Sequence, residues 1–262
     1  MNYTFCSQID PGRVRANNED SVAVDAVTQL AVLADGMGGY NAGEIASHMA
    51  TTLITQELGQ WLSEAGPQAR SSAVRRAIET AVGHANRAIF KASQASAHCA
   101  GMGTTLVLAV FRNQRLLVAH IGDSRCYRMR GGTLMQITKD HSLLQEQLDA
   151  GWLTPEQAAN SPIKNLVTRA LGVENQVRLE LNEHAVQSGD IYLMCSDGLS
   201  DMLDDAALSD VLRQDSVLAK MADTLVAHAN EMGGRDNIAV VLAQATGPTE
   251  EPRLISRWLG IA

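Results

Sequence analysis

The order of its apolar segments constrains the fold of this chain more than any other feature. Short apolar runs of strand length are interrupted by longer segments whose apolar residues recur at helical spacing. The predicted helices are 44–61, 72–95 and 216–231. The predicted strands are 21–26, 30–34, 105–111, 115–121, 126–130, 190–195 and 238–244. Because the helices do not alternate regularly with the strands, this order favours antiparallel sheet with helices grouped outside it over a doubly wound parallel sheet.

The chain of 262 residues suits one large domain or two small ones. We expect this domain to span residues 1–245 and to carry an irregular flap at about 139–172. The remaining residues, 246–262, form a predicted tail that opens with a Gly-Pro and acidic linker and closes with a short apolar and basic piece. A loosely packed terminus and a docking segment are both open interpretations of this tail.

The composition excludes several classes of function. The formal net charge is 21 − 29 = −8, which argues against broad binding to nucleic acid or to anionic membranes. The four cysteines are irregularly spaced and form no C-x-x-C pair, so we expect neither a zinc site nor a disulfide framework. The N-terminus has no signal layout, and the apolar runs are far shorter than the ~20 residues that span a bilayer. We therefore expect a soluble, cytoplasmic protein that binds neither nucleic acid nor membranes.

A glycine-rich loop directly follows the apolar run that ends at Asp35, in the stretch LAVLADGMGGYN. A P-loop for nucleotide phosphates would need a lysine after its last glycine, and this loop has none. A dinucleotide fingerprint would need a third glycine where Asn41 stands, and the Asp35 carboxylate would face the pyrophosphate. The loop is therefore not predicted to be a nucleotide-binding cradle.

Other acidic residues stand at similar junctions between an apolar run and a polar turn. Asp123 and Asp197 follow such runs, Asp236 precedes one, and Glu19 and Asp20 precede another. An acid at a strand end is also ordinary turn chemistry, and for each acid taken singly that alternative stays open. The repetition of the arrangement favours a common site.

If the fold gathers these carboxylates, electrostatics requires cations among them. Two carboxylates ~4 Å apart repel by roughly 4 kcal/mol at an effective dielectric constant of about 20. Their hard oxygen atoms favour Mg²⁺ or Mn²⁺ over zinc, and two such ions can activate water and bind a phosphoryl oxygen. An anionic substrate also needs a fixed cation, for which Arg15, four residues before Glu19, is the candidate. An ordinary surface arginine is the alternative.

Six motifs in this order resemble the bacterial branch of the metal-dependent protein phosphatases, also called type-2C protein phosphatases. They are VRANNED (14–20), ADGMGGYNAGE (34–44), GMGTTLV (101–107), GDSR (122–125), SDGL (196–199) and GGRDNIAVV (233–241). The resemblance covers about residues 3–244 and includes the flap. It implies an α+β fold in which a central sandwich of two antiparallel β-sheets is flanked by helices on both sides. It also implies hydrolysis of phosphoserine and phosphothreonine on proteins, with two Mn²⁺ or Mg²⁺ ions as cofactors.

The resemblance assigns metal ligands among the acids. Asp35 corresponds to the ligand that bridges two metals, and the Gly36 carbonyl and Glu19 join it on the second metal. Asp197 and Asp236 correspond to the ligands of the first metal.

Four further residues match positions of the family's site. Asp123, together with Asp197, matches a third and looser metal of bacterial members, and Asp20 matches an acid that orients metal-bound water. Arg15 matches the arginine that binds phosphate. Met37 stands where the eukaryotic branch has a histidine thought to protonate the leaving group. Since methionine cannot donate a proton, the proton has to come from elsewhere, such as water at the third metal.

The resemblance also implies partners: phosphoprotein substrates and a Hanks-type Ser/Thr kinase whose action the enzyme reverses. We expect a monomer. A non-catalytic pseudophosphatase would show broken metal ligands, whereas every matched ligand is intact; a phosphatase devoted to one partner in a signalling switch stays open. The GMGTT segment is expected to serve backbone packing under the site, and neither His141 nor His184 is expected to act in catalysis.

Overall fold

The fold was analysed in a computed structural model, which describes residues 1–39, 42–154, 157 and 166–247. Its strands are β1 (Asn2–Asp10), β2 (Asp20–Asp25), β3 (Leu30–Met37), β4 (Gly103–Thr104), β5 (Leu106–Arg112), β6 (Arg115–Ile121), β7 (Arg125–Arg130), β8 (Thr133–Gln136), β9 (Glu180–Ala185), β10 (Ile191–Cys195) and β11 (Ile238–Thr246). Its helices are α1 (Ala42–Ala65), α2 (Ser71–Ala95), the 3₁₀ turn η1 (Ala97–Cys99), α3 (Leu143–Asp149), α5 (Asp197–Ser200), α6 (Asp205–Leu212) and α7 (Leu218–Glu231).

Within the described residues the strands form two sheets, and every strand pairing is antiparallel. The first sheet has the order β1-β11-β10-β7-β8, and the second has the order β2-β3-β5-β6-β9, with β4 paired to β3. The two sheets stack face to face and enclose a shared core that contains Leu33 and Val107 from one sheet and Tyr192 and Val241 from the other. This core holds the two sheets together.

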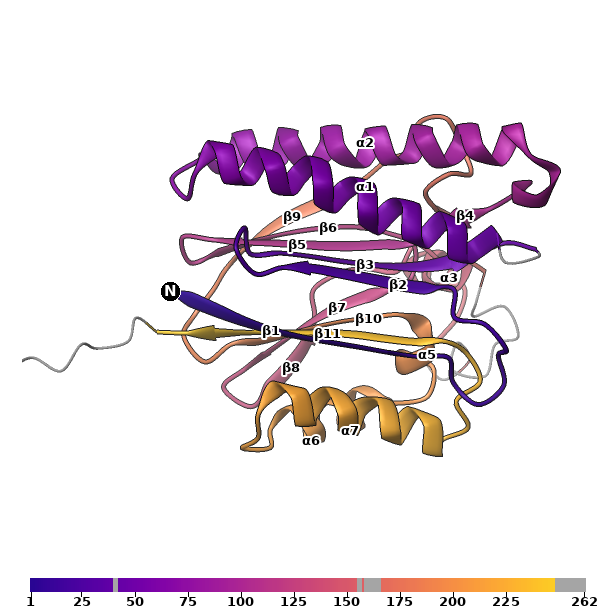
Figure 1. The fold of residues 1–262 in the computed structure, drawn as a ribbon. Helices are drawn as coiled ribbons and strands as arrows, with labels where there is room; N and C mark the ends of the chain where they lie inside the picture. Colours follow the sequence, from indigo (N-terminus) through magenta and orange to yellow (C-terminus); the bar gives the residue numbers. More distant parts are fainter. Residues whose placement is uncertain (40–41, 155–156, 158–165, 248–262) are drawn as a thin grey trace, which may run out of the picture.

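Helices cover both outer faces of the sandwich, as Figure 1 shows: α1 and α2 lie over the second sheet, and α6 and α7 lie over the first. The second sheet packs its outer face against Ile54 of α1 and Ile78 of α2, and the first packs against Leu225 of α7. Strand β3 is apolar on both faces for this reason, since alternate residues along it point to the inner core and to the helices. The predicted α+β sandwich with helices on both sides is confirmed.

Several elements carry no clear signal in the sequence. Strands β1 and β9 lie at sheet edges and are rich in polar residues, so neither shows an apolar run. Helix α6 has 8 residues, too few to establish a helical period, and it was missed for that reason. Each of these elements lies at the periphery of the molecule. One side of each faces solvent and therefore needs no apolar residues.

The proposed division of the chain stays a prediction. The described part of the flap contains α3, whereas residues 155–156 and 158–165 lie outside the described residues. Strand β11 ends at Thr246, and most of the predicted tail, residues 248–262, also lies outside them. No helix in the described part of the chain has the length and apolar character needed to cross a bilayer.

Candidate active site

The acids singled out in the sequence lie at one edge of the sandwich because both sheets end there. Asp20 begins β2 and lies opposite Asp35 of β3 in the strand register of the second sheet. In the first sheet, Asp197 lies two residues after the end of β10 and Asp236 lies two residues before the start of β11. Asp123 lies in the turn between β6 and β7. Residues far apart in sequence therefore meet where strands of both sheets end.

A pocket of about 270 Å³ opens at this edge. Its lining includes the predicted site residues Arg15, Glu19, Asp35, Gly36, Asp123, Asp197 and Asp236. Met37, Thr105, Val167 and Asn237 also line it. The remaining predicted residue, Asp20, is buried behind the pocket rather than in its lining.

Hydroxyl groups of the GMGTT segment fix the backbone of Asp35. The Asp35 amide donates to Thr105 Oγ1 at 3.0 Å, and the Thr105 amide donates to the Asp35 carbonyl at 2.8 Å. Thr104 Oγ1 donates to the same carbonyl at 2.8 Å. With its backbone held in this way, the Asp35 carboxylate is directed by β3 rather than by a free loop.

Two glycines allow α1 to start directly against the end of β3. A Cβ atom on Gly36 would collide with the backbone of Gly43, and one on Gly43 would lie 2.8 Å from Glu19 Oε2. Only glycine permits so close an approach of two backbones and a carboxylate. The GMGG loop predicted from the sequence thus serves close packing at the pocket, in line with its failed match to a nucleotide cradle.

Asn237 was missed by the sequence analysis, although it ties the N-terminal segment of the site to β11. Its Nδ2 donates to the carbonyls of Pro11 and Asn17, at 3.0 and 2.8 Å, and its Oδ1 accepts from the Glu19 amide at 2.8 Å. The only sequence signal was its position directly after Asp236. This one amide side chain holds Glu19 beside the acids of the other sheet.

Ser196 was missed as well, and it forms the main contact of Asp20. Its Oγ accepts from the Ala239 amide at 2.9 Å and donates to Asp20 Oδ2 at 2.7 Å. The other oxygen, Asp20 Oδ1, is buried without a hydrogen-bond donor among the described residues. The neighbouring Asp35 carboxyl could supply one only in its protonated form.

The carboxyl groups of the pocket have raised pKa values. Burial and then the carboxylates of Asp20, Asp197, Asp123 and Asp236 raise the pKa of Asp35 well above its usual value. Burial, with Asp123 as the next largest cause, raises the pKa of Asp197 to about 8. As free carboxylates these groups repel one another, so the cluster requires either protons or cations.

The other acids share this behaviour to different degrees. Burial raises the pKa of Asp20 to about 7 and that of Asp123 to about 6, and the Asp140 carboxylate adds to the effect on Asp123. The pKa of Glu19 is also raised by burial, against the opposing effect of Arg15. The carboxylates that line the pocket are buried or half-buried, and their hard oxygen atoms fit a divalent cation such as Mn²⁺ or Mg²⁺.

Arg15 is the cationic side chain that lines this acidic pocket. Its Nη2 lies 2.8 Å from Asp236 Oδ2, and its side chain is 53% exposed against 34% for Asp236. The guanidinium therefore lies at the mouth of the pocket, held there by an acid of the site. An arginine so placed can exchange its carboxylate partner for an incoming anion.

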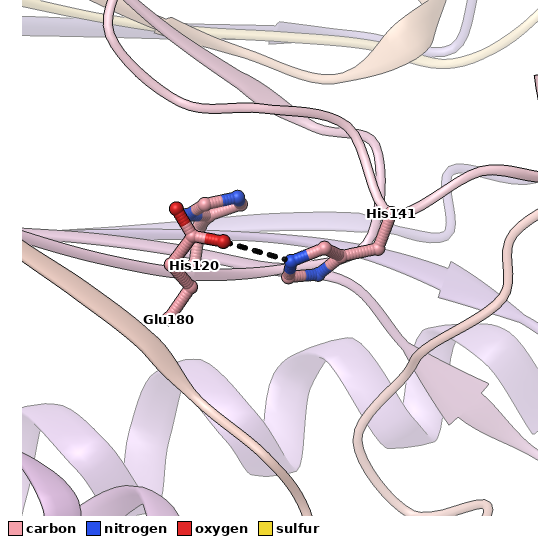
Figure 2. A group of neighbouring side chains, drawn as sticks. All are labelled: His120, His141 and Glu180. Carbon is pink, nitrogen blue, oxygen red and sulfur yellow. Dashed lines mark hydrogen bonds and ion pairs between the residues drawn. The ribbon is translucent and has the colours of Figure 1, made fainter. Parts of the chain in front are cut away.

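A separate group of side chains, His120, His141 and Glu180, offers ligand atoms that all lie within 4.8 Å of one another (Figure 2). None of the three lines the pocket. His184 does not line it either.

Comparison with known proteins shows which family the chain belongs to. Residues 13–243 match the family model described as protein phosphatase 2C. The serine/threonine phosphatase stp of Listeria welshimeri is 37% identical over 238 residues, which covers 90% of this chain and 93% of that protein. The crystal structure of the Mycobacterium tuberculosis serine/threonine phosphatase PstP/Ppp matches with a TM-score of 0.86 and 38% identity, covering 94% of this chain and 100% of that chain. A structure of the PstP catalytic domain in complex with two manganese ions matches with a TM-score of 0.83 and 38% identity, covering 94% and 99%.

The fold and the acidic pocket together define a metal-dependent phosphatase. The chain belongs to the protein phosphatase 2C family. The predicted family, fold class and kind of enzyme are thereby confirmed.

Proposed function

We propose that this phosphatase hydrolyses phosphoserine and phosphothreonine on proteins by direct attack of water on phosphorus, without a phosphoenzyme. The observation that carries the proposal is the convergence of Asp35, Asp197, Asp236 and Glu19, from both sheets, on one pocket with an arginine at its mouth. The carboxylates supply the negative charge that holds divalent cations, and the arginine supplies the positive charge that holds a phosphate.

The cations would be held by chain residues in the following way. Asp35, Glu19 and the Gly36 carbonyl would hold one ion, and Asp35, Asp197 and Asp236 would hold the other. Asp123 and Asp197 would hold a third. Bound ions of this kind activate water and stabilise charge on phosphoryl oxygens.

The remaining residues position the reactants. Arg15 binds the phosphate through two N–H groups of its guanidinium. Its hydrogen bond to Asp236 holds it at the mouth of the pocket. Asp20, held by Ser196 behind the pocket, would help to orient the attacking water. Met37 lines the pocket without a proton to give, so the leaving oxygen takes its proton from solvent on the Asp123 side.

Removal of metal tests the proposal. Treatment with excess EDTA is expected to abolish turnover of a phosphoserine peptide, and added Mn²⁺ is expected to restore it, because the acids alone cannot bind an anion. The release of inorganic phosphate measures both. Robust turnover in excess EDTA would falsify the proposal, and failure of every divalent cation to restore turnover would favour a non-catalytic phosphoprotein-binding module.

The role of Arg15 is tested by Arg15→Lys. Lysine keeps the charge but loses the two-pronged contact with phosphate. We expect kcat/KM for a phosphoserine peptide to fall about 10- to 100-fold, which corresponds to loss of a charged hydrogen bond. Arg13→Lys is the matched control, since Arg13 does not line the pocket, and it should leave kcat/KM within about twofold. If both substitutions lowered kcat/KM equally, Arg15 would be an ordinary surface arginine and not the residue that binds phosphate.

The source of the leaving-group proton is tested by Asp123→Ala. An aryl phosphate has an acidic leaving group that needs no proton, whereas the serine oxygen of a phosphopeptide needs one. We expect the variant to lose about tenfold more activity on the phosphopeptide than on phenyl phosphate. Unchanged turnover of both substrates would show that Asp123 has no part in the reaction.

The proposed partners follow from the reaction. Phosphoprotein substrates are implied by membership in a protein phosphatase family, and the enzyme that it opposes is a Hanks-type Ser/Thr kinase. We further propose that the chain acts in the cytoplasm as a monomer, for which the residues that line the pocket would suffice. Comparison of phosphoproteomes from cells with the wild-type protein and with an Asp35→Asn protein would identify the substrates, and a single changed phosphoprotein would indicate a phosphatase devoted to one partner.

A further inference from the structure

The segment of residues 139–141 is bonded at three successive positions to the turn that carries Asp123 and to the ends of the strands beside it, β6 with His120 and β7 with Arg125. His120 Nε2 donates to the Lys139 carbonyl at 2.8 Å. The Asp140 carboxylate accepts from the guanidinium of Arg125, with 2.7 Å between Nη2 and Oδ2. The His141 amide then donates to the Gly122 carbonyl at 2.9 Å. The position of this segment therefore fixes the position of the turn.

The same segment is bonded on its other side to the end of the flap. The Thr168 amide donates to the His141 carbonyl, and the Leu143 amide donates to the Leu166 carbonyl, both at 2.8 Å. Between these two bonds Ser142 and Val167 form an isolated β-bridge. Val167 and Asp123 both line the pocket. Two walls of the pocket, the flap end and the Asp123 turn, are thus joined through this intervening segment. A second connection runs through Thr104, which pairs with Leu171, and Thr105, whose hydroxyl bonds that of Ser124.

The side chain of His141 adds a second contact to the Asp123 turn. The Gly122 amide lies 3.2 Å from His141 Nδ1. A backbone amide can only donate, so Nδ1 is the acceptor and the proton of the ring is on Nε2. Burial lowers the pKa of His141, which agrees with a neutral ring. His141 consequently binds Gly122 with both its backbone amide and its ring.

The contacts of the other ring nitrogen of His141, Nε2, account for the cluster of His120, His141 and Glu180 in Figure 2. With its proton on Nε2, His141 donates toward Glu180 Oε2, 3.4 Å away. Nη1 of Arg169, from the end of the flap, lies 3.3 Å from the same Nε2 and places a fixed positive charge beside the ring. The His120 ring stacks on it at 4.7 Å between ring centres, and it is itself held by its bond to Lys139. A protonated Nε2 has no lone pair for a metal ion, so the hydrogen bonds favour a structural clamp over a metal site here.

We propose that His141 is a positioning residue that holds the Asp123 turn against the end of the flap, so that cation binding at Asp123 and the conformation of residues 166–169 are coupled. The proposal rests on the assignment of Asp123 to the third cation site in the proposed function. Gly122 has a φ of +99°, and a Cβ atom in its place would lie 2.7 Å from Thr105 Cγ2, so the turn is packed closely against Thr105. A loss of the His141 contact is therefore transmitted to the Asp123 carboxylate.

The test compares two substitutions that each preserve one edge of the ring. In His141→Asn the amide oxygen takes the place of Nδ1 and can still accept from Gly122, whereas in His141→Gln the amide reaches the place of Nε2. Mn²⁺ binding to the metal-free, full-length proteins is measured by titration calorimetry. We expect His141→Gln to weaken the weakest Mn²⁺ site about tenfold, the equivalent of one hydrogen bond, and His141→Asn to remain within about twofold of wild type.

Hydrogen exchange provides the readout of coupling. In His141→Gln, but not in His141→Asn, amides of 120–125 and of 166–171 should exchange faster together, and Mn²⁺ should no longer slow both segments. His184→Asn is the control, since His184 is a half-buried histidine of the same strand, β9, that bears Glu180. Equal Mn²⁺ affinity and exchange in both His141 variants, with melting temperatures near wild type, would overturn the proposal.

Asp123→Ala separates this proposal from the proposed function. The proposed function predicts that Asp123→Ala loses the weakest Mn²⁺ site entirely. If that site persists, the assignment of Asp123 has failed. If it is lost while His141→Gln binds Mn²⁺ normally, only the role of His141 has failed.

Discussion

Asp35→Asn is expected to lower kcat/KM for a phosphoserine peptide by about 10³-fold or more while raising the melting temperature of the metal-free protein. The loss of activity follows from the central position that we propose for Asp35 between two cations. The gain in stability is expected because burial and the neighbouring carboxylates of Asp20, Asp197 and Asp123 disfavour the ionised form of Asp35. Asparagine cannot ionise and escapes this cost. Each 1 kcal/mol of relief shifts the melting temperature of a domain of this size by about 2–4 °C.

The two effects have opposite signs, which distinguishes a metal ligand from a structural residue. A structural acid would lose stability on substitution. Asp210→Asn is the control, because the Asp210 side chain is 78% exposed and pairs only loosely with Arg213, and it should change neither quantity. A drop in the melting temperature of metal-free Asp35→Asn, measured by calorimetry in EDTA, would contradict the prediction.

The metal-free protein is also expected to lose stability as the pH rises from about 4 to about 8. The pKa values of Asp123, Asp20 and Asp197 in the folded protein are raised to about 6, about 7 and about 8. A carboxyl group whose pKa is higher in the folded state is more easily protonated there, so its stabilising effect is complete below its unfolded pKa. That effect is lost as the pH rises through the folded value. Since one unit of pKa corresponds to about 1.4 kcal/mol, the sum over the cluster should reach several kcal/mol.

Bound Mn²⁺ should reverse this dependence, because a cation favours the ionised carboxylates. Guanidinium unfolding at pH values across this range, in EDTA and in Mn²⁺, measures both curves. Asp197→Asn in EDTA serves as the matched variant and should show a shallower fall in unfolding free energy. A free energy of unfolding in EDTA that is constant over the range would mean that the acids are not gathered as the structure places them.

The sequence permitted prediction of the fold class and of the acids around the pocket for a definite physical reason. A strand buried on both faces, such as 30–34, must be continuously apolar, and an acid such as Asp35 at its end interrupts that run visibly. The catalytic roles of those acids rest on the family resemblance and stay predictions. The edge strands β1 and β9 could not be predicted, because one side of each needs no apolar residue.

The supporting contacts of the site could not be predicted either, because they depend on which distant segments meet. Asn237 is one amide among many in the sequence, and its value comes from facing Pro11, Asn17 and Glu19. The same holds for His141, whose partners Gly122 and Thr168 lie on separate parts of the chain. Neither His141 nor His184 lines the pocket, and the expectation that neither acts in catalysis stays a prediction.

The pairing of β1 with β11 joins the first strand of the domain to the last, and β11 also separates β1 from β10 in the sheet. Almost the whole domain must therefore emerge from the ribosome before β1 and β11 can pair. Asp236 lies just ahead of β11, so the acids of the pocket are also incomplete until that moment. Contacts between such distant segments form late and slow the folding of a domain. A nascent or prematurely terminated chain would thus carry no phosphatase activity into the cell.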